Sequence, residues 1–346
     1  MHTKYIKIEN DIDSAADHSG IRTAAEILLS GGLVAVPTET VYGLAANALD
    51  AAAVEKIFRA KGRPQDNPLI VHIHNFSQMD ELISELDPRV FPLAEAFWPG
   101  PLTVVLPKSA LVPEEVSGGL STVAIRMPAH PAARAILEAA GIPLAAPSAN
   151  RSGSPSPTTA QHVLADLDGR IDAVVDAGPC AVGLESTVLA LTEERPRLLR
   201  PGGVSPEQLE AVLGPVQTDP AVYAALPESA AAPSPGMKYK HYAPRAKVIL
   251  VKASSEQYAA YVKARAAGSV ALCFTEDLPA LSPAAAIAYG GERDAEEQAH
   301  KLFAALRRVD EMGAETAYVH CPATEGLGLA VYNRLLRAAA FQIVEL

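Results

Sequence analysis

The sequence predicts an α/β protein with two domains. Short β-rich segments alternate with segments of helical periodicity along most of the chain, which is the pattern of sheets covered by helices. The 346 residues exceed the usual size of a single domain. Between Pro215 and Arg245, prolines and small residues replace helical or strand periodicity, so we interpret residues 215–245 as a linker. The expected domains are therefore 1–214 and 246–346.

The first domain is expected to hold a large mixed sheet. A helical pattern over 21–29 is followed by an apolar segment at 33–36 that predicts a strand. Asp50 can cap a helix that runs to about Ala60, with Gly62 as its stop. Further strands are predicted at 69–73, 103–106, 122–127, 143–146, 172–177, 186–191 and 197–200. Further helices are predicted at 89–97, 131–140 and 158–167.

The second domain shows a strict alternation of strand and helix patterns. The expected strands span 247–251, 269–274 and 316–320, and the expected helices span 254–266, 294–310 and 327–338. Such alternation predicts a small parallel, Rossmann-like sheet with right-handed crossovers. The segment GLGLA at 326–330 lacks the third glycine of a dinucleotide fingerprint and opens the last helix rather than the first, so it does not predict a dinucleotide site.

Composition excludes several classes of function. With 49% hydrophobic and 20% charged residues, the chain is expected to be a folded, soluble globule. The net charge of −11 argues against a generally basic nucleic-acid-binding surface. Cys180, Cys273 and Cys321 lie far apart, which indicates neither a zinc ribbon nor a disulfide scaffold. The polar N-terminus and the lack of any run of ~20 apolar residues predict a cytoplasmic protein.

The first candidate site segment is PTETVYGLAANA at 37–48. It leaves a strand through Pro37 and places Thr38, Glu39 and Thr40 at the carboxyl end of that strand, where open α/β sheets bind ligands. An ordinary turn with packing for Tyr42 fits the segment equally well.

The second segment, RAKGRPQDNPLIVHIH at 59–74, is basic. Arg59, Lys61 and Arg63 accompany a single acid, in a loop that carries one glycine and two prolines. Cations on such a loop suit a polyanion such as a triphosphate, and a solvated basic loop is the alternative. His72 and His74 alternate along the following strand and point to opposite faces, which excludes a simple two-histidine metal clamp but leaves one histidine able to face a site.

Two later segments add an arginine and a set of hydroxyl groups. Strand parity puts Arg126 on one face with Thr122, and a half-buried arginine calls for an anionic partner, either a structural acid or a ligand carboxylate. Residues 146–163 form a loop whose hydroxyls and backbone N–H groups suit phosphate oxygens, although Thr158 as a helix cap on a flexible connector is the simpler alternative. The polar side chains of this loop are Ser148, Asn150, Ser152, Ser154, Ser156, Thr158 and Thr159.

The linker is basic, whereas signatures of covalent or P-loop chemistry are missing. No acid occurs between Glu228 and Glu256, and this stretch carries Tyr239, His241 and Tyr242 among its cations. Such a stretch could close over an anionic ligand as a lid, with a solvated tether as the alternative. No GxxxxGK[ST], GxSxG or HExxH motif occurs, so a Walker-type ATPase, an α/β-hydrolase and a zincin lack their signatures.

Seven of these segments resemble, in order and spacing, the YrdC-like domain of the threonylcarbamoyl-AMP synthase family. They are PTETVYGLAANA, KGRP followed by NPLIVHI, FWPGPLTVVL, VAIRMP, PLAAPSANRSG, ESTVL and LLRPGG. SPGMKYKHYAP and the α/β tail resemble its longer, two-domain form, so the likeness covers essentially the whole chain. The resemblance implies a YrdC-like twisted mixed sheet with helices around a concave cleft. It also implies a nucleotidyltransferase that condenses L-threonine, bicarbonate or CO₂, and ATP into threonylcarbamoyl-AMP and pyrophosphate.

The resemblance also implies roles for individual residues. It assigns threonine binding to Thr38, His72, Arg126, Ala146 and Ser186. It assigns ATP binding to Lys61, Arg63, Asn67, Thr122, Ser148, Ser156, Arg200 and Tyr239. Lys61 and Arg63 are the implied catalytic cations, while Tyr242 or His241 could take the place of Tyr239, because linker lengths vary. We expect Mg²⁺ to be held mainly by ATP and water, since the sequence shows no dedicated carboxylate cluster.

The implied reaction is the first step toward threonylcarbamoyladenosine in tRNA. The implied partner is therefore the downstream tRNA threonylcarbamoyl transferase machinery, with no membrane partner. Two alternatives remain. A sugar-phosphate enzyme of the dihydroxybutanone phosphate synthase-like fold would need clustered acids, and only Glu39 and Glu185 lie near the motifs. An RNA-binding module would use Lys61, Arg63 and the linker lysines on backbone phosphates.

Overall fold

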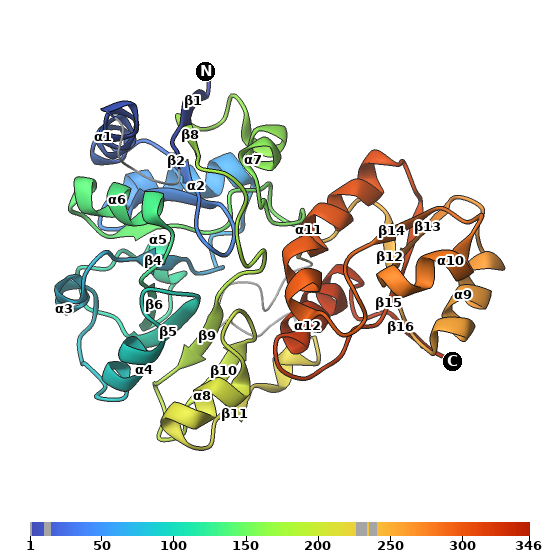
Figure 1. Ribbon diagram of the computed structural model, residues 1–346. Coiled ribbons are helices and arrows are strands. Elements are labelled where there is room, and N and C mark those ends of the chain that lie inside the picture. The colour runs from blue at the N-terminus through green and yellow to red at the C-terminus, as the bar shows by residue number, and fades with distance from the viewer. Residues whose placement is uncertain (1, 10–14, 226–233, 235–240) are drawn as a thin grey trace.

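The computed structural model describes residues 2–9, 15–225, 234 and 241–346. Within these residues the strands form two sheets, a mixed sheet of eleven strands and a parallel sheet of five (Figure 1). The first sheet uses strands up to residue 218, and the second uses strands from residue 247 onward. The predicted fold class, a large mixed sheet beside a smaller parallel one, is confirmed.

The first sheet joins strands that are distant in sequence. Its strands are β1 (Lys4–Lys7), β2 (Val34–Val36), β3 (Gly43–Asn47), β4 (Ile70–His72), β5 (Leu102–Pro107), β6 (Thr122–Arg126), β7 (Leu144–Ala145), β8 (Ala173–Asp176), β9 (Thr187–Ala190), β10 (Arg197–Arg200) and β11 (Gln217–Thr218). Their order is β1-β8-β2-β3-β7-β4-β6-β5-β9-β10-β11. The parallel register of β4 and β6 pairs His72 with Arg126, so both strands deliver a polar side chain to the same edge.

Helices cover both faces of this sheet. They are α1 (Ala15–Leu29), α2 (Ala51–Lys61), α3 (Met79–Leu82), α4 (Val90–Phe97), α5 (Glu114–Ser117), α6 (Pro131–Ala140), α7 (Ala160–Leu167) and α8 (Pro206–Leu213), with 3-10 turns η1 (Phe76–Gln78) and η2 (Pro220–Val222). The main apolar core lies between the sheet and α2, α4 and α7, and a second core lies under α1 and α6. A small cluster that includes Ile70, Ala124 and Val188 covers the opposite face of β4, β6 and β9.

Local capping explains why α2 delivers a lysine to the interior. The Asp50 carboxylate accepts hydrogen bonds from the N–H groups of Ala52 at 3.0 Å and Ala53 at 3.2 Å. Gly62 ends the helix with φ 63°, a left-handed conformation that favours glycine. Lys61 is therefore the last helical residue, and its side chain is buried.

The C-terminal domain is a five-stranded parallel sheet between two layers of helices. Its strands are β12 (Lys247–Lys252), β13 (Ser269–Cys273), β14 (Ala286–Ala288), β15 (Thr316–His320) and β16 (Ile343–Glu345), in the order β14-β13-β15-β12-β16. Its helices are α9 (Ser255–Lys263), α10 (Leu278–Leu281), α11 (Ala295–Glu311) and α12 (Gly328–Ala338), with the 3-10 turn η3 (Thr275–Asp277). In Figure 1, α11 and α12 lie on the side that faces the first domain, and α9 and α10 lie on the far side.

The two domains share an apolar cluster. Val41 and Leu184 of the first domain pack with Tyr242 of the linker and with Phe303 and other residues of the C-terminal domain. Gly183 approaches α11 so closely that a Cβ atom there would lie 2.6 Å from the Cα of His300. The C-terminal domain is therefore packed against the chain segment that leads into β9.

The structure differs from the sequence predictions in several elements. Residues 43–47, expected within a loop, form β3. The predicted basic loop at 59–63 also proves partly helical, because Arg59 and Lys61 occupy the last turn of α2. The elements β1, β11, β14, β16, α3, α5, α8 and α10 were not predicted. All of these strands have only two to four residues, too few to show a period, but the Ser205 capping box of α8 is visible in the sequence SPEQ.

Candidate active site

A cleft opens where several strands of the first sheet end. It encloses about 560 Å³, including its mouth. β2, β4, β6, β7 and β10 supply residues at or just beyond their C-terminal ends, and the segment before β9 supplies two more. The lining residues are Thr38, Thr40, Val41, Gly43, Arg63, Ile70, His72, Arg126, Ala146, Pro147, Ser148, Glu185, Ser186, Arg200, His241 and Tyr242. The position matches the rule that open α/β sheets bind ligands beyond the carboxyl ends of their strands.

The structure brings together every residue that the family resemblance assigns to threonine. Thr38, His72, Arg126, Ala146 and Ser186 all line the cleft. The Thr38 hydroxyl donates to the Val41 carbonyl at 2.7 Å, which fixes the turn after β2. The Ser186 hydroxyl lies 2.7 Å from the Thr103 hydroxyl and accepts a hydrogen bond from Arg200 at 3.2 Å. Both hydroxyl groups are thus held in fixed positions before any ligand arrives.

Arg126 is anchored in the cleft through all three of its guanidinium nitrogens. Its Nε donates to the Gly100 carbonyl at 3.2 Å, its Nη1 to the Thr40 hydroxyl at 2.9 Å, and its Nη2 to Glu39 Oε1 at 2.6 Å. Burial alone would raise the pKa of Glu39, but the charge and hydrogen bond of Arg126 outweigh burial and lower it. Of the two anionic partners that the sequence left open for Arg126, the structure contains the acid.

His72 is held as a neutral imidazole. Burial lowers its pKa well below the ordinary value, and the neighbouring positive charge of Arg126 lowers it further. His74 lies beyond the end of β4, with Nε2 2.7 Å from the Asn75 amide nitrogen, and does not line the cleft. The expectation that one histidine of the pair can face a site therefore applies to His72.

The residues assigned to ATP divide into two groups. Arg63, Ser148 and Arg200 line the cleft, while Lys61, Asn67, Thr122 and Ser156 do not line it. Among these four, Thr122 is half-buried at the start of β6 and the other three are buried. Tyr239 lies outside the described residues. Both polar atoms of the Asn67 amide are buried without a hydrogen-bond partner in the described part of the chain.

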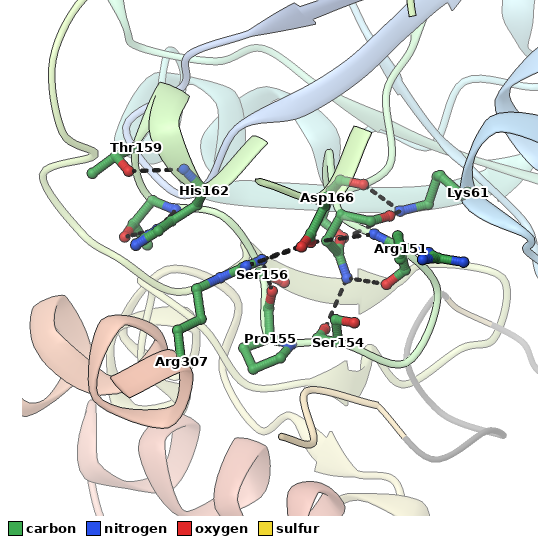
Figure 2. A network of polar contacts seen from close by, with 12 residues as sticks. Lys61, Arg151, Ser154, Pro155, Ser156, Thr159, His162, Asp166 and Arg307 are labelled. Atoms are coloured by element: carbon green, nitrogen blue, oxygen red, sulfur yellow. Dashed lines mark hydrogen bonds and ion pairs between the residues drawn. The ribbon is translucent and has the colours of Figure 1, made fainter. Parts of the chain in front are cut away.

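Lys61 does not line the cleft but anchors the hydroxyl-rich loop at 146–163. Its Nζ donates to the carbonyl of Ser148, to the carbonyl of Asn150 at 2.6 Å, and to the Asn150 side-chain oxygen at 3.3 Å. The Asn150 amide in turn donates to the Ser154 carbonyl at 2.8 Å, and Figure 2 shows Lys61 on one side of this network. Burial, with the charge of Arg63, lowers the pKa of Lys61 well below its ordinary value.

The helix after this loop is capped one residue later than the sequence suggested. Thr159, rather than Thr158, is the capping residue of α7, and its hydroxyl accepts from the His162 N–H at 3.3 Å. The Ser156 hydroxyl donates to Glu185, across the cleft wall from the loop. The loop is therefore fixed by its own side chains and is no flexible connector.

Comparison with known protein families identifies both halves of the chain. The model of a family described as "Telomere recombination" matches residues 26–202. A second model, described as "Threonylcarbamoyl-AMP synthase, C-terminal domain", matches residues 204–340. The chain belongs to the threonylcarbamoyl-AMP synthase family. The family resemblance inferred from the sequence is confirmed.

Relatives in the threonylcarbamoyl-AMP synthase family match over nearly their whole length. A threonylcarbamoyl-AMP synthase of Pyrococcus abyssi is 46% identical over 331 residues, which are 94% of this chain and 95% of the relative. Another, of Bacillus subtilis, is 43% identical over 349 residues, 99% of this chain and 100% of the relative. The crystal structure of P. abyssi Sua5 complexed with L-threonine has a TM-score of 0.91 at 45% identity and covers 99% of this chain and 100% of that one.

In this member of the threonylcarbamoyl-AMP synthase family, sequence reasoning missed several cleft residues. Thr40 and Glu185 were noted near the motifs but received no role. His241 and Tyr242 entered only as alternatives to Tyr239, yet both line the cleft. Tyr242 has φ 64°, which is uncommon for an aromatic residue and gives the end of the linker a defined bend. The acid-free stretch around these residues was the signal in the sequence.

The donor atoms of the cleft do not fit a metal ion held by the protein. The described residues contain no group of three or more His, Cys, Asp or Glu side chains that could hold a metal ion. The acids at the cleft, Glu39 and Glu185, each form an ion pair with an arginine. The acid cluster needed by a sugar-phosphate enzyme of the kind considered above is therefore absent from the described residues as well. In the same part of the chain, no helix is long and apolar enough to cross a membrane.

Proposed function

We propose that the protein is an L-threonylcarbamoyladenylate synthase. It condenses L-threonine, bicarbonate or CO₂, and ATP to threonylcarbamoyl-AMP and pyrophosphate, which is adenylyl transfer to a carbamate. The observation that carries the proposal is the convergence of Thr38, His72, Arg126 and Ser186 on one cleft, in a chain that matches a threonine-bound relative throughout. The product would feed threonylcarbamoyladenosine formation in tRNA through a separate transferase machinery.

Threonine would bind through its carboxylate to Arg126. The Nη1 and Nη2 atoms of Arg126 each carry a second N–H that its contacts with Thr40 and Glu39 do not use. A guanidinium presents two parallel N–H groups, which matches the geometry of a carboxylate. Neutral His72 and the anchored hydroxyls of Thr38 and Ser186 would then face the amine and hydroxyl of the substrate, while Ala146 bounds the pocket.

ATP would occupy the adjoining part of the cleft. Arg63, Arg200 and Ser148 line this part and suit phosphate oxygens. Lys61 and Ser156 do not line the cleft and would act indirectly, by fixing the loop at 148–156. The side-chain amide of Asn67, which has no hydrogen-bond partner among the described residues, is a candidate donor or acceptor for the nucleotide. Thr122 and Tyr239 complete the proposed ATP set, and closure of the linker over the site remains part of the proposal.

The chemistry needs no covalent protein intermediate. The neutral amine of threonine adds to CO₂ and loses a proton, which gives a carbamate. A carbamate oxygen then attacks the α-phosphorus in line, and the bond from this phosphorus to the bridging oxygen of pyrophosphate breaks. Alignment of the two substrates supplies part of the rate, up to ~7–11 kcal/mol in ideal cases. Cationic groups stabilise charge on the phosphate oxygens, with Arg63 as the candidate for direct contact and Lys61 acting through the loop that it holds.

Magnesium would enter with the nucleotide as part of the substrate. The carboxylates at the cleft are engaged by arginines, so the described residues offer no ligand set of their own. Mg²⁺ binds readily through phosphate oxygens and water, which needs few protein ligands.

Purified full-length protein with α-labelled ATP provides the test. We expect a labelled AMP adduct and pyrophosphate only when threonine and bicarbonate are both present. Omitting each substrate in turn is the control, and mass spectrometry identifies the adduct. Turnover that is independent of threonine, or no turnover under any of these conditions, would contradict the proposal.

A further inference from the structure

The part of the cleft proposed for ATP contains a buried carboxylate, that of Glu185. Glu185 lines the cleft with Arg63, Arg200 and Ser148, and it is 7% exposed. Its Oε1 accepts the hydrogen bond of Ser156. An uncompensated carboxylate at this position would repel a triphosphate, because charges in a site with little water interact strongly.

The compensating charge comes from the other domain. Arg334, on α12, is fully buried, and its Nε donates to Glu185 Oε2 at 2.7 Å. Its Nη2 donates to the Glu185 carbonyl at 3.3 Å and its Nη1 to the Pro201 carbonyl at 2.9 Å. Burial would raise the pKa of Glu185, but the charges of Arg334 and Arg200 outweigh it and lower the pKa. Glu185 is thus kept ionised, and its charge is directed at Arg334.

A second arginine of the C-terminal domain holds the adjoining loop. Arg307, on α11, donates from Nη1 and Nη2 to the Asp166 carboxylate at 3.1 and 2.8 Å, and from Nη2 to the Pro155 carbonyl. Figure 2 shows Arg307 reaching this loop from the C-terminal domain, beside Ser156. Pro155 and Ser156 are consecutive, so Arg307 fixes one of them directly and Arg334 fixes the other through Glu185.

Backbone packing strengthens the same connection. His300 Nδ1 lies 3.1 Å from the Ala181 carbonyl, and the Cβ of any larger residue at Gly183 would collide with α11. Residues 181–183 are therefore packed against the C-terminal domain, and the next residues of the chain include Glu185 and Ser186, which line the cleft. The guanidinium of Arg334 also lies 5.5 Å from the ring of Tyr242, the linker residue on the cleft wall.

We propose that Arg334 and Arg307 of the C-terminal domain are positioning residues of the ATP site in the first domain. Arg334 orients and neutralises Glu185, and Arg307 fixes the loop at 155–156, so that the cleft accepts a polyphosphate. This inference rests on the proposed function, because it names ATP as the ligand. It gives the C-terminal domain a specific task, which is to complete the nucleotide half of a cleft whose threonine half belongs to the first domain.

The test is a cycle of substitutions in the full-length protein. Arg334→Met should raise the KM for ATP roughly thirtyfold, because one partner of a buried charge pair is lost, while the KM for threonine changes less than about threefold. In the double variant Glu185→Gln/Arg334→Met, the unpaired charge is gone and the glutamine oxygen can still accept from Ser156. Its KM for ATP should therefore return to within about threefold of the Glu185→Gln value.

A milder pair of variants controls for misfolding. Arg307→Met should raise the KM for ATP about threefold to tenfold, since a fixed loop contact is lost without exposing a charge in the cleft. Arg308→Met, on the same helix, removes only an exposed pair with Glu311 and should leave both KM values unchanged. Thermal unfolding of every variant establishes that it is folded under the conditions of the assay.

Binding of the α,β-methylene analogue of ATP, measured by calorimetry, separates this inference from the proposed function. Absence of product from the wild-type protein would refute the proposed function, and analogue binding by the variants would still test the role of the two arginines. Equal rises in both KM values for Arg334→Met would overturn the inference. So would failure of the double variant to recover, or an Arg307→Met variant that binds the analogue as Arg308→Met does.

Discussion

The carboxyl ends of the strands line a cleft in the first domain, whereas in the C-terminal domain they are closed by polar contacts. In the first domain, Arg63, Arg126 and Arg200 line an open cleft at this position. In the C-terminal domain, the ends of β12, β13 and β15 meet at His320, which is 3% exposed. Its Nδ1 lies 2.7 Å from the Asp277 carboxylate and its Nε2 3.0 Å from the Ala253 carbonyl. Here the protein's own polar groups satisfy one another.

This difference shows that the carboxyl end of a parallel strand forms a binding site only where the polar groups of the chain do not already occupy it. Around the C-terminal sheet, Glu297 accepts the N–H of Gly291 and Glu276 accepts the N–H of Glu292, so carboxylates of the chain occupy N–H groups that could otherwise hold an anion. In the first domain the corresponding region carries arginines that line a cleft. One sheet end therefore suits ligand binding, whereas the other is closed by polar groups of its own domain.

The largest expected effect is in the open cleft, at Arg126. Arg126→Ala should lower kcat/KM for threonine about a thousandfold, equivalent to about 4 kcal/mol, because it removes the proposed carboxylate contact and leaves Glu39 buried without its cation. The KM for ATP should change far less. Steady-state kinetics with each substrate varied in turn provides the measurement.

Arg22→Ala, at an exposed position on α1, is the control for Arg126→Ala and should behave as the wild type. Equal effects of Arg126→Ala on both substrates would show that Arg126 supports the cleft as a whole, and the proposed carboxylate contact would be wrong.

Local signals in the sequence were sufficient for most of the first domain. The cap at Asp50, the stop at Gly62 and the parity of Arg126 each depend on residues that are close in sequence, and each matches the structure. The five residues assigned to threonine binding could be named only through the family resemblance, because the motifs that contain them carry it. These residues converge on one cleft because of the order of the strands in the sheet. The motifs do not specify this order by themselves and indicate it only through the family resemblance.

The contribution of the C-terminal domain could not be predicted, for a physical reason. Arg334 and Glu185 are 149 residues apart, and their ion pair exists only because two domains pack together. The periodicity of the sequence predicts the apolar face of α12 but not which element packs against that face. The helix also buries residues on most of its circumference, including Asn333, Arg334 and Arg337. The basic residues near Gly62 were likewise taken as one site, although α2 sends Arg59 to solvent and Lys61 to the interior.

A medium effect is expected at the sealed strand ends of the C-terminal domain. Burial alone would lower the pKa of His320, but the hydrogen bond to Asp277 and the Ala253 carbonyl outweigh burial and raise it above 6.5. A raised folded-state pKa means that the charged form stabilises the fold below pH 6.5, and that this stabilisation disappears as the pH rises through the folded-state value.

We therefore expect His320→Gln to lower the free energy of unfolding by about 2 kcal/mol at about pH 6, and by much less at about pH 9. Denaturant titration of both proteins across this range provides the measurement, and the KM for threonine should stay unchanged. A difference in stability that is constant with pH would show that the pKa of His320 is the same in the folded and the unfolded protein, and that packing against Tyr258 accounts for its contribution.

The smallest effect is expected at Cys180, which tests whether the open cleft depends on cations alone. Cys180 is 1% exposed, and burial raises the pKa of its thiol to about 12, so almost no thiolate exists at neutral pH. Cys180→Ala should change kcat/KM less than about threefold, with Cys273→Ala in the C-terminal domain as the matched control. Loss of turnover in Cys180→Ala without loss of stability would instead indicate a covalent intermediate. The cleft would then hold a nucleophile as well as cations, and its contrast with the sealed domain would be one of reactivity as well as charge.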